Sequence, residues 1–526
     1  MPDFELILLL LVVVATIVAI AHWVGIAYPI LLVIGGIGLG LLPGVPSVQL
    51  DPELVLVVFL PPLIFAAAWQ TPIRDVRENL QPVLLLSVGL VLFTTAVVGV
   101  VVAGVLPGLP LAAAFALGAI VSPSDVLAAT TVLSRIAVPR RVRAILEEES
   151  LVNDATALTV YRTAVAAAVS GTFVAADAIG TFALASVGGI AVGLVVAYVA
   201  DQLWRRLFDP PVEVSLSLVL PYAAYLPAEH LGASGVIAAA TAGLWLGYRS
   251  SRILGPDTRL VANSVWEILT FVLNGFAFLL VGLELPTILR GIAGRSGTDL
   301  IVDAAAVSLA VVVSRFVWVY GSLVLPKSIA RLRRRPGGKP MTSAIPLIVS
   351  WAGMRGAVSL AAALALPTGF PERNLILFLA FAVIGVTLLG QGLTFPAILS
   401  RIRVPPDGDE LEEETLARTT AIEAALAQLH RLRKRWPNHL PLIDHLEERY
   451  QHRVEHLPEE DDDGGLTLDP EHEAERVDHR AIRDALIAAE REAVIGLRDR
   501  HEISDEILRR LERELDLEEL RLEADL

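Results

Sequence analysis

Long runs of apolar residues, separated by short polar stretches, fill the first three quarters of the chain. Thirteen of these runs are long enough to cross about 30 Å of hydrocarbon as helices. Their approximate limits are 4–22, 27–42, 53–69, 81–105, 111–133, 145–168, 178–203, 213–229, 232–248, 262–289, 299–325, 342–366 and 375–400. The pattern therefore predicts an all-α polytopic membrane protein with about 13 transmembrane helices.

The polar loops between these runs differ in charge from one side of the membrane to the other. If the N-terminus lies outside, the cytoplasmic loops hold 17 Lys and Arg residues and the external loops hold three. Such an excess of positive charge is typical of cytoplasmic loops, and it appears only if the number of crossings has the right parity. We therefore expect a multi-pass protein of the cell membrane, with its N-terminus outside and its C-terminal tail in the cytoplasm.

The composition agrees with a membrane protein and narrows the kinds of site that the chain can contain. Hydrophobic residues make up 54% of the chain and charged residues 19%, and the mean hydropathy is +0.62. These values exclude an ordinary soluble globular domain. Because the chain has no cysteine, a disulfide framework and a thiolate metal site are also excluded. We expect no cofactor and no nucleic-acid partner.

Charge divides the chain into two parts. Residues 1–403 hold 25 Lys and Arg against 22 Asp and Glu, whereas residues 404–526 hold 17 against 35. We predict a transmembrane domain over 1–403 and an acidic, mostly helical cytoplasmic tail over 404–526. Within the tail, residues 421–435 and 480–526 have charged helical patterning, and the acidic run that starts at Glu459 is typical of a solvated linker. The tail is interpreted as a regulatory or oligomer-stabilising module.

Three of the charged residues in the predicted spans lie near the middle of the bilayer, where an ionised side chain costs at least several kcal/mol. Asp154 lies about nine residues into its span, which is roughly 14 Å deep at 1.5 Å per residue. Asp125 and Arg355 lie in two other spans at a depth of roughly 20 Å from the ends at which those spans begin. Because all three fall in the middle third of the bilayer, they predict a functional site rather than anchors at the membrane boundary.

Two of these spans contain residues that interrupt helices. Pro123 precedes Asp125 by two residues, and a proline inside a span frees backbone carbonyls. The segment Ile348–Gly356 starts with the same Ile-Val-Ser as Ile120–Ser122 and also runs into glycine. Corresponding breaks in two halves of a chain are the expected sign of inverted repeats, with an ion site where the broken crossing helices meet.

The span that holds Asp154 presents further oxygen ligands. Glu149 and Asn153 are four residues apart, as are Ser150 and Asp154, so the four polar groups share one helix face. Hydroxyl, amide and carboxylate oxygens suit a hard alkali cation better than a soft metal. Arg355 needs an acidic partner at the middle of the bilayer, and Glu149 is the predicted partner.

These segments resemble the monovalent cation/proton antiporter family, in particular the bacterial type of its sodium/proton exchanger branch. The matching segments are Ser122–Asp125, Glu149–Asp154, Gly353–Leu360 and Gln391–Thr394. They occur in the order found in the family, and the resemblance covers about residues 1–400. Each segment alone is a weak signal, but the four together are specific.

The resemblance implies roles for residues at the expected site. Asp154 is similar to the carboxylate that binds the ion and the proton, and is the expected ligand of Na⁺. Ser150 and Ser124 match positions that supply oxygen ligands. Asp125 matches the charge that compensates the ends of the broken helices. No residue of this set is expected to be catalytic, because the family consists of transporters and not of enzymes.

The resemblance also implies a stoichiometry and a mechanism. Asn153 next to Asp154 is similar to the one-aspartate type of site, which holds either one cation or one proton and therefore exchanges them 1:1 without net charge movement. Glu149 and Arg355 resemble a structural ion pair. The family further implies a homodimer in the lipid bilayer, alternating access by an elevator-like movement, and a role in pH and cation homeostasis.

Other functions remain alternatives. The cation is most simply Na⁺, but the sequence does not distinguish it from K⁺ or Li⁺, so a K⁺/H⁺ antiporter is one alternative. A monovalent cation channel would use similar buried oxygens but would conduct without counter-transport. An intramembrane enzyme would need a nucleophile or a metal set, and the only histidines in 1–403 are His22 and His230.

A glycine-rich segment, Gly35–Gly40, has the appearance of a phosphate-binding loop. Because it lies inside an apolar span, we predict instead that these glycines allow two helices to pack closely.

Overall fold

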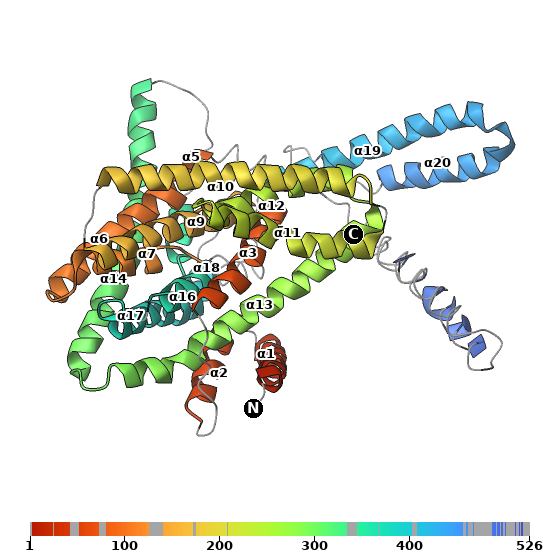
Figure 1. Ribbon diagram of the computed structural model, residues 1–526. Coiled ribbons are helices and arrows are strands. Elements are labelled where there is room, and N and C mark those ends of the chain that lie inside the picture. Colours follow the sequence, from red (N-terminus) through yellow and green to blue (C-terminus); the bar gives the residue numbers. More distant parts are fainter. Residues whose placement is uncertain are drawn as a thin grey trace. The chain divides into compact units, whose positions relative to one another are not determined.

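Figure 1 shows the protein as a computed structural model, which forms two compact units, residues 1–405 and 406–526. In the first unit the structure describes residues 3–24, 26–42, 52–72, 80–125, 140–171, 175–207, 209–333, 344–367 and 369–401. In the second unit it describes residues 408–455, 459–460, 466–467 and scattered positions between 486 and 518.

The described part of the first unit is built from helices. In chain order they are α1 (Asp3–Val24), α2 (Tyr28–Gly40), α3 (Pro52–Gln70), α5 (Leu80–Leu84), α6 (Leu90–Val105), α7 (Leu111–Val121), α9 (Arg140–Ser170), α10 (Ala175–Trp204), α11 (Pro210–His230), α12 (Gly235–Ile253), α13 (Pro256–Gly291), α14 (Gly297–Arg333), α15 (Ala344–Trp351), α16 (Ala357–Leu364), α17 (Arg373–Gly385) and α18 (Gly392–Arg401). Two π-helical segments, η1 (Leu85–Gly89) and η2 (Val386–Gln391), connect α5 with α6 and α17 with α18.

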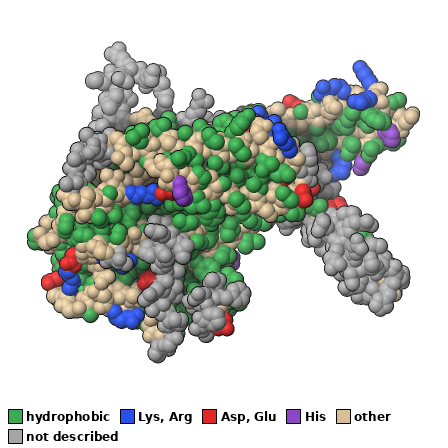
Figure 2. All heavy atoms as spheres, viewed as in Figure 1, with side chains coloured by type: hydrophobic (Ala, Val, Ile, Leu, Met, Phe, Trp, Pro, Cys, Tyr) green, Lys and Arg blue, Asp and Glu red, His purple; other side chains and the backbone are tan. Residues whose placement is uncertain are grey.

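These helices have the length and surface of a membrane protein. Within the described residues, five helical segments are long and apolar enough to span a bilayer: Leu80–Val105, Gly180–Trp204, Pro256–Gly291, Gly297–Ser322 and Arg373–Arg401. Shorter apolar helices accompany them, and hydrophobic side chains are spread over the visible face of residues 1–405 (Figure 2). The mostly helical membrane fold is thus confirmed, whereas the count of about 13 crossings and the inverted repeats stay predictions.

Two of the predicted spans are interrupted, as the proline and glycine residues in them suggested. The run predicted over 111–133 is helical as α7 only to Val121, and residues 126–139 lie outside the described part of the chain. The run predicted over 342–366 forms two short helices, α15 and α16, separated by non-helical backbone at 352–356. Non-helical backbone at membrane depth is tolerated where protein surrounds it.

Glycine contacts hold α2 closely against α13. A Cβ atom at Gly36 would lie 2.2 Å from the carbonyl oxygen of Leu279, and one at Gly282 would lie 2.2 Å from that of Val33. Only glycine therefore allows the two backbones to approach so closely, which confirms the packing role predicted for this segment.

Replacing Gly36 with alanine is expected to lower the melting temperature of the purified protein. The added methyl group would overlap backbone atoms, and overpacking of this kind costs about 1–3 kcal/mol. Gly38 on the same helix is the matched control, because nothing lies within 4 Å of the position of its Cβ. Thermal unfolding in detergent, followed by light scattering, should separate Gly36→Ala from Gly38→Ala. Equal melting temperatures would contradict the close contact.

The second unit contains a helical hairpin, in which α19 (Gly408–Arg435) and α20 (Leu440–Glu455) are joined through the short 3₁₀ helix η3 (Pro437–His439). Arg433 donates to Asp444 and, at 2.8 Å, to Glu447, so the two helices are linked by exposed ion pairs. Strand β1 (Glu459–Glu460) pairs antiparallel with β2 (Leu466–Thr467), where a linker was expected. Most of the helical pattern predicted over 480–526 lies outside the described residues.

Candidate ion-binding site

The two interrupted helices meet and bond to each other at their breaks. The backbone N–H of Asp125 donates to the carbonyl of Met354 at 2.7 Å. In return, the Arg355 guanidinium donates from Nε to the carbonyl of Val121 at 2.9 Å and from Nη2 to that of Ser122 at 3.4 Å. Carbonyls that lose their helical partners where α7 ends are thus satisfied by an arginine from the other interrupted helix.

Asp125 lies at the start of α16. Its Oδ2 atom accepts a hydrogen bond from the backbone N–H of Ala357 at 3.3 Å. The same oxygen would lie 1.6 Å from a Cβ atom at Gly356, so only glycine leaves room for the carboxylate there. A negative charge at this end of a helix is stabilised by the exposed N–H groups and the helix dipole.

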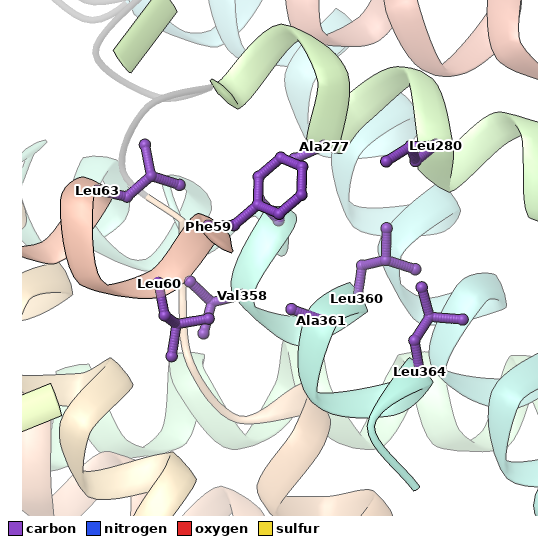
Figure 3. Close-up of a pocket in the computed structure, with 10 residues that line it drawn as sticks. Phe59, Leu60, Leu63, Ala277, Leu280, Val358, Leu360, Ala361 and Leu364 are labelled. Atoms are coloured by element: carbon purple, nitrogen blue, oxygen red, sulfur yellow. The ribbon is translucent and has the colours of Figure 1, made fainter. Parts of the chain in front are cut away.

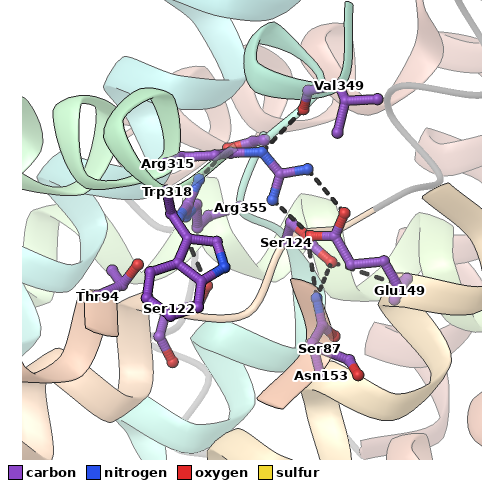
Figure 4. A network of polar contacts seen from close by, with 12 residues as sticks. Ser87, Thr94, Ser122, Ser124, Glu149, Asn153, Arg315, Trp318, Val349 and Arg355 are labelled. Carbon is purple, nitrogen blue, oxygen red and sulfur yellow. Dashed lines mark hydrogen bonds and ion pairs between the residues drawn. The ribbon is translucent and has the colours of Figure 1, made fainter. Parts of the chain in front are cut away.

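Glu149 of α9 forms a buried ion pair with Arg315 of α14 (Figure 4). Both side chains are 1% exposed, and two bonds of 2.5 and 2.9 Å join Nη1 and Nη2 to the two carboxylate oxygens. Ser124 Oγ also donates to Glu149 Oε1 at 2.7 Å. The charge of Glu149 is therefore compensated within the protein.

This pairing corrects the one predicted from the sequence, which joined Glu149 to Arg355. Arg315 lies in the predicted span 299–325 and, like Arg355, falls near the middle of the membrane. The Arg355 side chain, however, turns toward backbone carbonyls, including that of Gly353. Arg315 faces Glu149 instead, and its Nε atom donates to the carbonyl of Val349 at 2.9 Å. The bidentate fork of Arg315 fits the carboxylate, whereas the donors of Arg355 are used at the helix breaks.

Asn153 and Ser150 bring α9 into contact with the broken segment. Asn153 Nδ2 donates to the carbonyl of Ser124 at 3.2 Å and to its Oγ at 2.9 Å, and Ser150 Oγ donates to the same carbonyl at 3.3 Å. The other amide atom, Asn153 Oδ1, is buried without a hydrogen-bond partner among the described residues. The predicted ligands Ser124, Ser150 and Asn153 thus lie together at one place.

Asp154 lines a cavity of about 340 Å³ together with Asp125 and Glu147. Its side chain is half-buried, and within the described part of the chain its carboxylate makes no hydrogen bond or ion pair. None of the described residues that line the cavity is a Lys, Arg or His. The neutral polar lining residues are Gln70, Thr71, Ser124, Ser150, Thr270, Asn274 and Ser359.

Next to the polar cavity, helices α3, α13 and α16 contact one another through apolar side chains (Figure 3). The first turn of α16 borders the polar cavity, but Leu360 and Leu364 further along face Phe59 and Leu60 of α3 and Leu280 of α13. A void of only about 10 Å³ remains between these side chains. The polar cavity is therefore bordered at α16 by a tightly packed apolar cluster.

Part of the cavity lining consists of residues that were not predicted from the sequence. Thr270 and Asn274 of α13 and Gln70 at the end of α3 border the cavity, yet none of them was singled out. The spacing of Thr270 and Asn274, one helical turn apart in an otherwise apolar run, is the signal that could have revealed them.

Interrupted helices that bond at the middle of a polytopic protein, beside a cavity with an uncompensated carboxylate, define a secondary transporter of cations. Comparison with known proteins agrees. A sequence model of the family described as "Sodium/hydrogen exchanger, transmembrane" matches residues 8–401. The chain therefore belongs to the sodium/hydrogen exchanger family, whose members exchange cations for protons, as the motifs predicted.

Individual relatives support this assignment. The chain is 36% identical to a protein of Mycobacterium tuberculosis named an uncharacterized Na⁺/H⁺ exchanger, over 99% of this chain and 96% of the relative. It is 33% identical to the Na⁺/H⁺ antiporter ApNhaP of Aphanothece halophytica, over 77% and 75% of the two chains. The fold is similar to that of the sodium proton antiporter MjNhaP1 of Methanocaldococcus jannaschii at pH 8, with a TM-score of 0.60 and 20% identity over 75% of this chain and 97% of that one.

Proposed function

We propose that this protein exchanges one Na⁺ for one H⁺ across the cell membrane and that the two ions compete for Asp154. The observation that carries the proposal is the difference between the carboxylates at the site. Glu149 is compensated by Arg315, and Asp125 is bonded at the start of α16. Asp154 lies on the cavity together with the predicted ligands Ser150 and Ser124, and its carboxylate has no hydrogen-bond or ion-pair partner among the described residues.

The neighbours of Asp154 fit an alkali cation. Ser150 and Ser124 border the same cavity with hydroxyl oxygens, and Asn153 Oδ1 is buried close to them without a partner in the described part of the chain. Such hard oxygen donors are the ligands that Na⁺ prefers over soft sulfur or nitrogen groups. Binding of either ion neutralises the carboxylate, which lowers the cost of moving the site through the low-dielectric part of the membrane.

A single exchanging carboxylate leads to an electroneutral cycle. Because residue 153 is an amide, only Asp154 changes its load, and the occupied site carries the same charge with Na⁺ as with H⁺. In the proposed cycle, helices α9 and α16 move in an elevator-like manner against α3 and α13, so that the apolar contact at Phe59 opens when the polar cavity closes. We further propose a homodimer, with the N-terminus outside, the acidic unit in the cytoplasm and a role in pH and cation homeostasis.

Electroneutral exchange predicts a rate that does not depend on membrane voltage. Proteoliposomes containing the protein and a trapped pH indicator would receive a Na⁺ gradient, while valinomycin and K⁺ set the voltage. Because one positive charge moves in each direction, we expect equal Na⁺-driven proton fluxes at inside-negative, zero and inside-positive voltage. A voltage-sensitive dye in the same vesicles verifies that the voltage was imposed, and a flux that follows it would contradict the 1:1 stoichiometry.

The same vesicles test the alternatives for the cation and for the transport mode. Proton flux driven by K⁺ but not by Na⁺, measured without valinomycin, would favour the K⁺/H⁺ antiporter. A channel would move Na⁺ without any proton flux in return, and the family assignment already favours exchange over that alternative.

A further inference from the structure

Three consecutive glutamates of α9 lie in different surroundings. Glu148 and Glu149 are 1% exposed, whereas Glu147 is exposed and lines the cavity that leads to Asp154. Glu147 and Asp154 are seven residues apart, which is about 10 Å along a helix, and Ser150 lies between them on the same face.

We propose that Glu147 is a recruitment site for the transported cation, which holds the ion at the mouth of the cavity before it reaches Asp154. The inference rests on the proposed function, since it concerns the path to the same site. It assigns to this glutamate a part in substrate affinity and none in the exchange of the proton at Asp154.

The charges around the cavity support recruitment. Its described lining includes three acids and no basic residue, and a cleft lined by charges of one sign raises the local concentration of the opposite ion. Arg143, one turn before Glu147, is exposed and is not part of the described lining. The charge of Arg143 attracts the Glu147 carboxylate, but no ion pair within 4.0 Å is formed between the two described side chains, and no basic residue lies in the described lining on the cavity side.

Neutral oxygen groups continue the path inward. Ser359 lines the cavity, is 1% exposed, and its hydroxyl has no hydrogen-bond partner among the described residues. Gln70 and Asn274 supply amide oxygens from α3 and α13. An alkali cation that leaves part of its hydration shell at Glu147 would meet such oxygens before it reaches Asp154.

A purely structural role explains Glu147 less well. Acidic residues stabilise a helix in its first turn, and the effect of the helix dipole falls off beyond it. The helix begins at Arg140, so Glu147 lies about two turns inside it. Its carboxylate makes no hydrogen bond within the described part of the chain, so its removal leaves no partner unsatisfied.

A charge series at position 147 tests the proposal in the full-length protein in proteoliposomes. Na⁺-driven proton flux is measured against Na⁺ concentration at low ionic strength. We expect Glu147→Asp to keep the wild-type KM, Glu147→Gln to raise it about three- to tenfold, and Glu147→Lys to raise it further, with kcat within about twofold throughout. Added choline chloride should bring the wild-type KM closer to that of Glu147→Gln, because salt screens the attraction.

Glu267→Gln is the matched control, since Glu267 is an exposed carboxylate of α13 outside the described cavity lining, and its KM should stay unchanged. If one variant does not fold, the KM values of any two folded proteins in the series still show whether KM depends on the charge at position 147. A KM that does not follow the charge at position 147, or a loss of kcat at constant KM, would overturn the inference. If the wild-type protein performs no Na⁺/H⁺ exchange, the proposed function fails first; if it does and the series has no effect, only the recruitment site is rejected.

Discussion

Replacing Asp154 with asparagine is expected to abolish cation/proton exchange while leaving the protein folded. Asparagine has nearly the same shape, but it neither titrates nor supplies the negative charge for which Na⁺ and H⁺ compete. Because the Asp154 carboxylate has no hydrogen-bond partner in the described residues, the substitution breaks no contact. We expect proton flux in proteoliposomes to fall to the level of protein-free vesicles, with a melting temperature equal to or above that of the wild type.

Two further measurements make this result specific. Na⁺ should raise the melting temperature of the wild-type protein through ligand binding, and this stabilisation should disappear in Asp154→Asn. Asp303→Asn is the matched control, because Asp303 is a largely buried carboxylate of α14 outside the described cavity lining, and it should retain exchange. Substantial flux in a folded Asp154→Asn protein would remove this residue from the centre of the mechanism.

Disrupting the Glu149–Arg315 pair is expected to have the largest effect on stability. Removing one partner leaves an uncompensated buried charge, which typically costs about 3–5 kcal/mol. Glu149→Gln and Arg315→Gln should each lower the melting temperature strongly, and the double variant should recover part of the loss. Arg315 also donates to the carbonyl of Val349, so recovery in the double variant is expected to be incomplete.

Arg355 provides the control for this double-mutant experiment. Arg355 bonds to backbone carbonyls, so Glu149→Gln combined with Arg355→Gln should show smaller coupling than Glu149→Gln combined with Arg315→Gln. Melting temperatures in detergent, measured for the four single and double combinations of each pair, give the coupling. Stronger coupling to Arg355 than to Arg315 would contradict the observed pairing.

The sequence predicted the helical membrane fold, the interrupted segments and the residues gathered near Asp154. These features follow from local rules: apolar length, helix-breaking residues and the spacing of polar groups on one helix face. The partner of Glu149 does not follow from such rules, because two arginines have a similar depth and either could have reached it. The choice depends on the carbonyls set free where α7 ends, and these acceptors exist only once two distant segments have met.

The lining of the cavity was only partly predictable for a related reason. Asp154 can be identified from the sequence because a charged residue within an apolar run costs free energy and therefore indicates a functional role. Gln70, Thr270 and Asn274 carry no charge, and neutral polar residues are common enough in membrane helices that none of them indicates a cavity by itself. Their shared role comes from the way α3 and α13 pack beside α9, which involves residues some 200 positions apart.

The junction of the interrupted helices also has a mechanical consequence. Four hydrogen bonds join residues 121–125 to residues 354–357, and two of them come from a single guanidinium. Sliding one segment past the other would break all four bonds at once. The four bonds thus link the two stretches of non-helical backbone to each other. We therefore expect a displacement of α16 to carry the end of α7 with it.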